Sequence, residues 1–358
     1  MVRSWHLEVE HLDVAGYEQV VRGRHTATGL DAVIAVHSTV LGPSLGGTRF
    51  HRYGSFDEAL TDVLRLAEGM TSKAAVAGLD QGGGKAVILG DPAVQRTDEL
   101  ILAYGRFVDS LGGAYLTAED VGTTQADMDL IRSVTPFVTG VSESLGGSGD
   151  PSPATAVGLA HALEAVAAHR FGAPSLEGRH VAVSGVGKVG SALVAHLASR
   201  GARVTVADVD DARVADMVRS HGVGTASPAA IHAVECDVFS PCALGGVLNA
   251  STIPELRCAV VCGSANNQLL EDADGNRLAA AGVLYVPDYV VNAGGIINIA
   301  EEWGGYDHGR AAARIAAIGT TTTAVLRLAE ADGTTPVEAA DRIAQRRIAA
   351  ALADRRDD

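Results

Sequence analysis

Two lysines in the stretch GMTSKAAVAGLDQGGGKAVILGDP, residues 69–92, have the type and spacing best suited to chemistry. Only three of the 28 Lys and Arg residues are lysines, namely Lys73, Lys85 and Lys188. Because this chain uses arginine for ordinary positive charge, a lysine indicates a role that arginine cannot fill. An amine that is buried or lies near a second cation can lose its proton, whereas a guanidinium stays charged. Lys73 and Lys85 together therefore offer a base near neutral pH.

The first lysine falls on a predicted helix. Ser55 and Glu58 form a capping-box pattern, and apolar residues then recur at helical spacing as far as Met70 and Ala74. Lys73 lies on or beside this buried stripe. A cation there needs an anionic partner, and in a cleft the partner can be the substrate.

The second lysine follows three glycines, Gly82, Gly83 and Gly84, and precedes an apolar strand at 86–89. We expect these glycines to let the backbone approach a ligand closely. GGGK is not a nucleotide-binding P-loop, since Leu79 and Ala86 replace the glycine and the hydroxyl residue that this motif requires. Two snorkelling lysines with only a structural role are the alternative.

Two further loops in the first half carry candidate groups. The strand-like segment at 33–37 is followed by LGPSLGGTRF, which reads as a glycine-rich turn. In that turn Gly46 can present its backbone N–H to a carboxylate, with Leu45 beside it as an apolar wall. After the short strand at 114–117, Glu119 and Asp120 stand where an acid or base can act, or where a turn residue is common.

A dinucleotide-binding pattern dominates the second half. The string GVGKVG matches GxGxxG, follows the strand-like HVAVS and opens a helix. The loop residues expected to admit a pyrophosphate are Gly185, Gly187, Lys188, Val189 and Gly190. Asp208 ends the next strand, where it can bind the ribose hydroxyls and repel a 2′-phosphate, which favours NAD over NADP.

Three later loops, PCALGG, GSANNQ and PDYVVNAGG, follow apolar segments at 237–239, 258–262 and 283–286. Ligands of open parallel sheets bind at the carboxyl ends of the strands. The residues expected to face the cofactor are therefore Ala243, Ala265, Asn266, Asn267 and Asn292, with the amides near the nicotinamide or serving as turn residues.

Composition limits the other classes of function. The chain has 358 residues, 47% of them hydrophobic, and a formal charge of -15, which argues against nucleic acid or an anionic membrane as a partner. The four cysteines lack metal-binding spacing, so we expect reduced thiols and no structural metal. The N-terminus shows no leader pattern and no long apolar span occurs, so we expect a cytoplasmic protein.

Taken together, LGGTRF, MTSKAA, GGGKAVI, TAEDVGTT, GVGKVG and NAGGIIN resemble the amino-acid dehydrogenase family of leucine, valine, phenylalanine and glutamate dehydrogenases, closest to the leucine and valine type. The resemblance implies an α/β fold with an N-terminal substrate domain, residues 1–140, and a C-terminal Rossmann NAD-binding domain, residues 141–329. It also implies a cleft between the domains, a last helix at about 330–358 that returns to the first domain, and a homo-oligomer.

The resemblance further assigns roles to residues. Lys73 would bind the substrate carboxylate, with the backbone near Gly46; Lys85 would activate water, and Asp120 would shuttle protons. The side-chain pocket implied by similarity is formed by Leu45, Met70, Ala118, Ile296 and Ile299. Family members acting on glutamate need a cation and a hydroxyl where this chain has Leu45 and Ile299, so a neutral substrate is expected.

The expected reaction is reversible NAD-dependent oxidative deamination of a branched-chain L-amino acid such as valine, leucine or isoleucine, giving the 2-oxo acid and ammonia. Aromatic amino acids such as phenylalanine are the alternative substrates. A catalytically silent NAD-binding regulatory protein and a 2-hydroxy-acid dehydrogenase are the other functions weighed. The latter would need a catalytic histidine with an arginine partner, and no histidine lies in the motif loops.

Overall fold

The computed structural model describes residues 6–357, with side chains described to residue 355. Residues 1–5, part of the N-terminal segment judged to lack a leader pattern, lie outside the described residues. The chain divides into two compact units. The first contains the residues up to Asp150, Ile299–Asp307 and the residues from Ala344 onward; the second contains Pro151–Asn298 and His308–Ile343.

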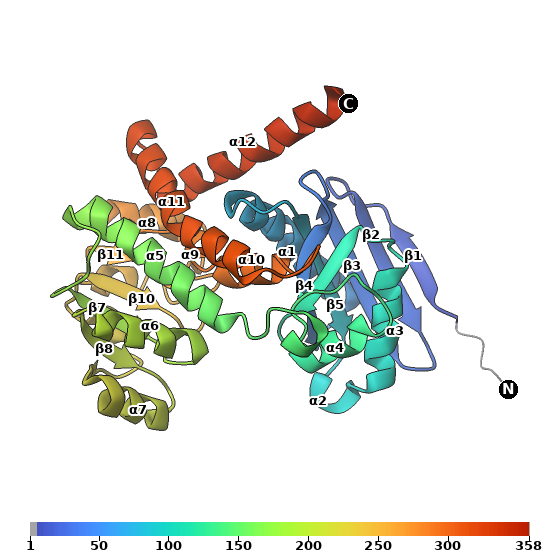
Figure 1. Cartoon of the computed structure of the whole chain (residues 1–358), viewed down its shortest axis with the longest axis horizontal. Coiled ribbons are helices and arrows are strands. Elements are labelled where there is room, and N and C mark those ends of the chain that lie inside the picture. The colour runs from blue at the N-terminus through green and yellow to red at the C-terminus, as the bar shows by residue number, and fades with distance from the viewer. Residues whose placement is uncertain (1–5, 358) are drawn as a thin grey trace. The chain divides into compact units, whose positions relative to one another are not determined.

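The first unit is built on a mixed six-stranded sheet (Figure 1). Its elements are β1 (Glu8–Leu12), β2 (Gln19–His25), β3 (Leu30–Ser38), β4 (Ser44–His51), α1 (Phe56–Val76), β5 (Gly82–Leu89), α2 (Pro92–Gln95), α3 (Asp98–Asp109), β6 (Tyr115–Glu119), α4 (Gln125–Arg132) and a 3-10 turn at Glu143–Leu145. The strand order is β1-β2-β3-β5-β4-β6. β4 runs parallel to both β5 and β6, so it is the central strand between them.

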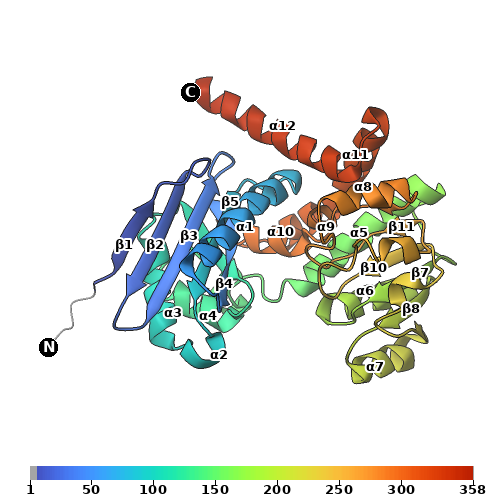
Figure 2. The ribbon, with the colours of Figure 1, turned by 180° about the vertical axis from the view of Figure 1, so that it is seen from behind.

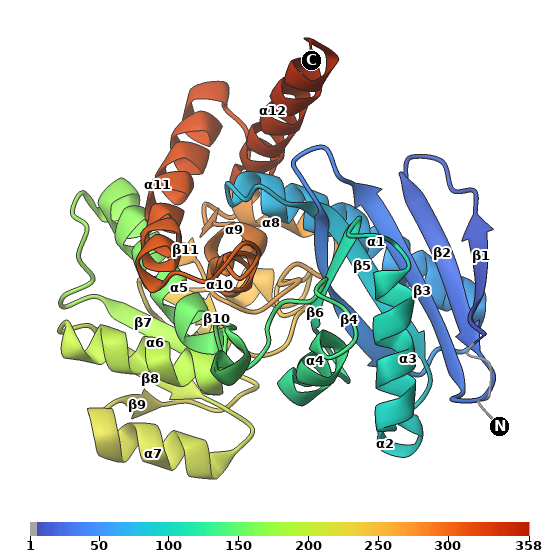
Figure 3. The same ribbon diagram turned by 45° about the vertical axis from the view of Figure 1, so that its right-hand side comes forward.

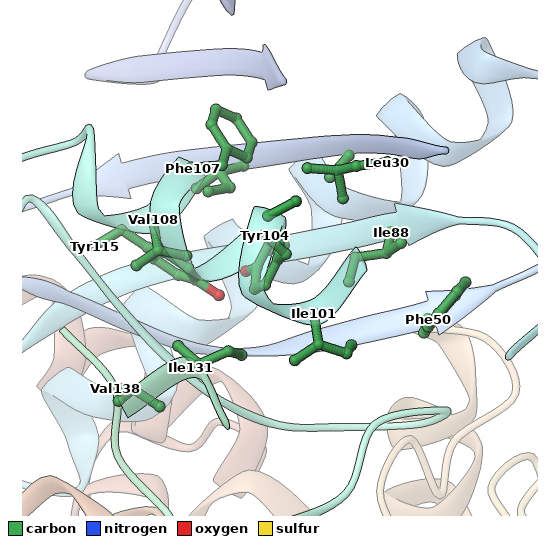
Figure 4. Close-up of a cluster of buried hydrophobic side chains, with 14 of the residues drawn as sticks. Leu30, Phe50, Ile88, Ile101, Tyr104, Phe107, Val108, Tyr115, Ile131 and Val138 are labelled. Atoms are coloured by element: carbon green, nitrogen blue, oxygen red, sulfur yellow. The ribbon is translucent and has the colours of Figure 1, made fainter. Parts of the chain in front are cut away.

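The two faces of this sheet are covered by different helices (Figure 2). On one face α1 packs its small apolar side chains, Ala59, Val63 and Ala67, against Val33 and Val87. On the other face α3 and α4 cover a larger aromatic and aliphatic cluster, part of which is drawn in Figure 4. Because side chains alternate along a strand, neighbouring residues of β5 belong to opposite faces.

The second unit contains a six-stranded parallel sheet with the order β12-β11-β10-β7-β8-β9 (Figure 3). Its elements are α5 (Ser152–Phe171), β7 (His180–Ser184), α6 (Lys188–Ser199), β8 (Arg203–Ala207), α7 (Asp211–His221), β9 (Gly224–Thr225), a 3-10 turn at Ile231–Ala233, β10 (Val238–Pro241), a 3-10 turn at Ile253–Glu255, β11 (Val260–Val261), α8 (Ala273–Ala280), β12 (Leu284–Tyr285), α9 (Asp288–Val291) and α11 (His308–Asp332). This order, with strands on either side of β7, is the doubly wound arrangement that the glycine motif predicted.

Two helices contain residues of both units. They are α10 (Gly294–Ala300) and α12 (Pro336–Asp357). The end of α12 is bonded within the first unit, where Arg347 Nη1 donates to Ala75 O at 3.1 Å. α12 begins at a capping box, in which Thr335 and Glu338 exchange hydrogen bonds.

The expected boundary at residues 140 and 141 differs from the division in the structure, where the first unit continues to Asp150. The reason is a set of hydrogen bonds within the first unit. The Glu302 carboxylate accepts from the backbone N–H groups of Gly140 at 2.9 Å and Ser148 at 2.8 Å. The Gly- and Ser-rich segment is thereby fixed to this unit instead of forming a free linker.

Candidate active site

Lys85 and Asp120 form an ion pair in the first unit. Lys85 lies in β5 and is only 6% exposed, while Asp120 directly follows β6. β4 separates these two strands, so the lysine side chain crosses over β4 to reach the carboxylate. The sequence named both residues but contained no sign that they would contact each other.

Gly47 creates the space in which this contact forms. A Cβ atom at position 47 would stand 2.8 Å from Cβ of Asp120 and 2.7 Å from O of Glu119. At Gly46 a Cβ atom would meet Gly84 O at 1.8 Å. Both glycines are therefore needed for strand packing, and our prediction that they form a turn is wrong because they lie in the middle of β4.

The glycines before Lys85 also lie in a strand, so β5 begins at Gly82, earlier than the strand predicted at 86–89. At Gly83 a Cβ atom would lie 2.1 Å from N of Thr71 in α1. The close neighbour of this glycine is thus α1 itself. The helix and the strand touch at Thr71 and Gly83. Lys73, in the last turn of α1, lies two residues after Thr71, and Lys85 lies two residues after Gly83.

The Asp120 carboxylate is held in the ionised form. Burial raises the pKa of Asp120, but the charge and hydrogen bond of Lys85, the Val121 N–H and the charge of Arg49 lower it, and the net pKa lies below the usual value. Val121 N–H donates to Oδ1 at 2.6 Å. Oδ2 meets Lys85, so both carboxylate oxygens have partners.

Thr123 orients the backbone of Asp120. Its hydroxyl accepts from Asp120 N–H at 3.0 Å and donates to Thr48 O at 2.9 Å in β4. Thr124 then caps α4, with a capping box to Asp127. The loop that carries Asp120 is thus tied to the strand beneath it.

Four of the five predicted pocket residues belong to the first unit, and three of these lie on the α1 side of its sheet. Leu45 and Ala118 are buried and share the face of Lys85, because Leu45 pairs with Gly83 and Ala118 pairs with Gly47. Met70 lies in α1, partly buried. The other two are on α10, where Ile296 belongs to the second unit and Ile299 to the first.

Sequence reasoning missed Arg49, which is two residues beyond Gly47 on the same face of β4. Arg49 Nη1 pairs with Asp62 Oδ2 of α1 at 2.7 Å, and Tyr53 OH donates to the same oxygen at 2.7 Å. The alternation of side chains along LGGTRF would have indicated Arg49, had that segment been interpreted as a strand.

The glycine loop of the second unit is shaped to admit a phosphate group. Gly190 and Gly185 pack too closely for a side chain, since a Cβ atom at Gly190 would lie 2.0 Å from Gly185 O. Gly187 is the N-cap of α6 and has no side chain to cap the helix, so a phosphate group can approach this helix N-terminus closely. Lys188 is exposed as the first residue of α6, followed by Val189.

Asp208 ends β8 beside this loop, as predicted. Its carboxylate accepts from Val186 N–H at 2.8 Å and from Asp210 N–H at 2.9 Å. Burial raises the pKa of Asp208, but these N–H groups and the charge of Arg213 together lower it by more, so the net pKa lies below the usual value and the group stays ionised. A fixed anion next to a phosphate-binding helix terminus suits the ribose of a dinucleotide.

The loops after β10, β11 and β12 bring most of the other predicted residues together. Ala243 lies against Gly185, where an added Cβ would come within 2.7 Å of Ala243 Cβ. Asn292 Nδ2 donates to Asn266 Oδ1 at 2.8 Å, so these amides form one polar group. Ala265 N–H donates to Pro241 O at 2.9 Å, at the end of β10. Asn267 is a turn residue with φ of 53°.

Within the described part of the chain, no group of three or more His, Cys, Asp and Glu residues is arranged to hold a metal ion. The four cysteines are free thiols. None of the described helices combines the length and the apolar character needed to cross a membrane.

Comparison with known proteins identifies the family. The model described as the Glu/Leu/Phe/Val dehydrogenase dimerisation domain matches residues 17–136, and the model described as Glutamate/Leucine/Phenylalanine/Valine dehydrogenase matches residues 146–216 and 206–356. The chain belongs to this family. It is an amino-acid dehydrogenase with the two-domain α/β fold, as the sequence predicted.

Relatives of this dehydrogenase are similar over nearly the whole chain. Leucine dehydrogenase of Bacillus cereus is 48% identical over 95% of this chain and 93% of its own length. Valine dehydrogenase of Streptomyces albus is 51% identical over 96% of each chain. The crystal structure of L-tryptophan dehydrogenase from Nostoc punctiforme has a TM-score of 0.85 and 39% identity, covering 94% of this chain and 97% of that chain.

Proposed function

We propose that this dehydrogenase catalyses the reversible, NAD-dependent oxidative deamination of a branched-chain aliphatic L-amino acid to the 2-oxo acid and ammonia. The observation that carries the proposal is the buried Lys85–Asp120 pair. It provides one proton donor and one proton acceptor for the attack of water and the release of ammonia. The leucine and valine dehydrogenases among its relatives support the substrate class.

In this proposal the substrate carboxylate binds to Lys73 and to the backbone near Gly46. A bound nicotinamide supplies the hydride acceptor for the hydrogen on Cα. The neutral amine of Lys85, left after the pair has released one proton, then takes a proton from water as the water oxygen attacks the imine carbon, and Asp120 passes protons to the nitrogen so that ammonia leaves. The ion pair supports these roles, because a proton can move between the two groups without crossing bulk solvent.

Asp208 supports NAD as the cofactor. A carboxylate held ionised beside the glycine loop repels the 2′-phosphate of NADP and accepts hydrogen bonds from the two hydroxyls of an unphosphorylated ribose. The residues that would hold the cofactor are those of the glycine loop, Asp208 and the loop residues Ala243, Ala265, Asn266, Asn267 and Asn292.

The residues that we propose to form the side-chain pocket are all apolar. Leu45, Met70, Ala118, Ile296 and Ile299 offer no charge to a glutamate side chain, whose burial without a partner would be unfavourable. Discrimination among valine, leucine and isoleucine then depends on single methylene groups, each contributing about 1–3 kcal/mol. Aromatic amino acids are the second candidate, which the similarity to a tryptophan dehydrogenase favours.

We further propose a homo-oligomer, since the family model over residues 17–136 is described as a dimerisation domain. Four free thiols suit the reducing conditions of the cytoplasm, which we propose as its location.

A panel of L-amino acids tests the proposed function directly. Each amino acid is supplied with NAD or NADP, and the reduced cofactor is followed by absorbance. We expect the highest kcat/KM for valine, leucine or isoleucine with NAD, and an ammonia requirement in the reverse direction. Much faster turnover of phenylalanine or tryptophan would overturn the assigned substrate class, and turnover of hydroxy acids without ammonia would overturn the reaction.

A further inference from the structure

We propose that Arg49 is a positioning residue of the reaction centre, whose fixed positive charge sets the protonation of the Lys85–Asp120 pair without touching the substrate. The inference rests on the proposed function, in which that pair moves protons. Arg49 acts through the pair and is not itself a catalytic residue.

The first support is the place of Arg49 in the sheet. Thr48 of β4 pairs with Glu119 of β6, and Phe50 N–H donates to Val121 O at 2.8 Å. Arg49 follows Thr48 on β4, and Asp120 follows Glu119 at the end of β6. Asp120 lies over Gly47, which is two residues before Arg49 on the face that α1 covers. Lys85 reaches Asp120 from β5, the strand on the other side of β4. The guanidinium is thus anchored next to the ion pair by the backbone of the strand that separates its two members.

The second support is the incomplete pairing of the Arg49 side chain. One nitrogen, Nη1, pairs with Asp62 Oδ2 at 2.7 Å. Arg49 Nε is buried and has no hydrogen-bond partner among residues 6–357. A buried donor without a partner is unfavourable. An arginine that served only to bind Asp62 could do so without burying Nε. The position of Arg49 is better explained by the nearby Lys85–Asp120 pair.

The third support is the balance of charge around Asp120. Lys85 faces it from β5 and Arg49 from β4, while α1 contributes Asp62, Arg65 and Lys73 to the same face. Burial lowers the pKa of Arg49, but Asp120, Asp62 and then Tyr53 raise it, so that the net pKa lies above the usual value.

Because a guanidinium remains charged at every pH at which the enzyme works, Arg49 is a constant positive charge. Such a charge favours the state of the Lys85–Asp120 pair that holds fewer protons. Asp62 partly offsets this effect from the other side of the arginine. The pair can then accept a proton from water or substrate at a lower pH than it could without Arg49.

The test is the pH profile of kcat/KM for oxidative deamination in Arg49→Gln. We expect the rising limb to move to higher pH by roughly one unit, since a nearby opposite charge shifts a carboxyl by about 1–3 units. Arg49→Lys keeps the charge and should restore the wild-type profile. Arg65→Gln is the matched control, because Arg65 binds the other oxygen of Asp62 but is 66% exposed. Its loss should leave the profile in place.

A second variant predicts a shift of the opposite sign. Asp62→Asn removes the charge that offsets Arg49, so the profile should move to lower pH. If a thermal melt shows that Arg49→Gln is not folded, the pH profiles of Asp62→Asn and Arg49→Lys still test the role of Arg49. Superimposable profiles of an active wild type and Arg49→Gln, or no acid shift in Asp62→Asn, would overturn the role of Arg49. A wild type inactive on every amino acid would instead overturn the proposed function, and this role with it.

Discussion

Asp120 lies directly over Gly47, with its Cβ atom 2.8 Å from the position that a Cβ would take at residue 47. Real Cβ atoms do not approach other atoms so closely, so Gly47→Ala must push Asp120 away from Lys85. We expect kcat to fall by roughly 100-fold, because displacing a reacting group by about 1 Å has that effect. NAD binding, measured by fluorescence titration, should be unchanged, since the glycine loop is in the second unit.

Gly69→Ala is the matched control for this change. Gly69 lies in α1, and a Cβ there would meet nothing within 4 Å. The alanine should leave kcat unchanged and stabilise the helix by roughly 0.5–1 kcal/mol. If Gly47→Ala kept the wild-type kcat, Lys85 and Asp120 would not need their observed contact.

Sequence reasoning succeeded for elements with a local signal and failed for β4, the strand that contains Gly47. The strand–glycine loop–helix pattern around Gly185 is local, so the sequence predicted β7, α6 and Asp208 in their correct places. α1 and its N-cap Ser55 were predicted for the same reason. β4 was predicted as a turn, because glycine pairs favour turns locally and only tertiary packing requires them in a strand.

The same distinction applies to the candidate site. A count of lysines was enough to single out Lys73 and Lys85. The pairing of Lys85 with Asp120 depends on the strand order β5-β4-β6, which is a non-local property. Arg49 was overlooked because its neighbour on β6 is far away in sequence.

Lys85→Ala tests the central assignment of the proposed mechanism. Without the amine, water has no adjacent base, so kcat should fall by about 10²–10⁴-fold. NAD binding should persist, and a thermal melt should show that the protein is folded. Steady-state kinetics with valine or leucine measures the loss. Wild-type turnover in this variant would show that another group activates water.

Lys73→Ala should behave differently from Lys85→Ala. The proposed contact with the substrate carboxylate exists in both the bound substrate and the transition state, so its loss should mainly raise KM. We expect an increase of at least roughly 10-fold, since hydrogen bonds to charged groups contribute about 1.5–3 kcal/mol. A large fall in kcat with an unchanged KM would instead place Lys73 in the chemistry.

Asp208→Ala should weaken the preference for NAD over NADP. Because the pKa of Asp208 is lowered, the carboxylate repels a 2′-phosphate throughout the working range of pH. In the wild type this repulsion should disappear only when the pH falls through that lowered pKa, which lies below the usual value of an aspartate. Comparing kcat/KM for the two cofactors measures the preference. An unchanged ratio in Asp208→Ala would assign cofactor selection to another residue.

Thr123→Val separates the position of Asp120 from its chemistry. Valine has nearly the shape of threonine but can neither accept from Asp120 N–H nor donate to Thr48 O, which the native hydroxyl does at 3.0 and 2.9 Å. The loop should then lose about 1–3 kcal/mol of stabilisation, and the carboxylate should lose its fixed place beside Lys85. We expect a lower kcat with little change in KM. Thr123→Ser keeps the hydroxyl and should restore most of kcat, whereas a purely steric role for Thr123 would make serine the more damaging substitution.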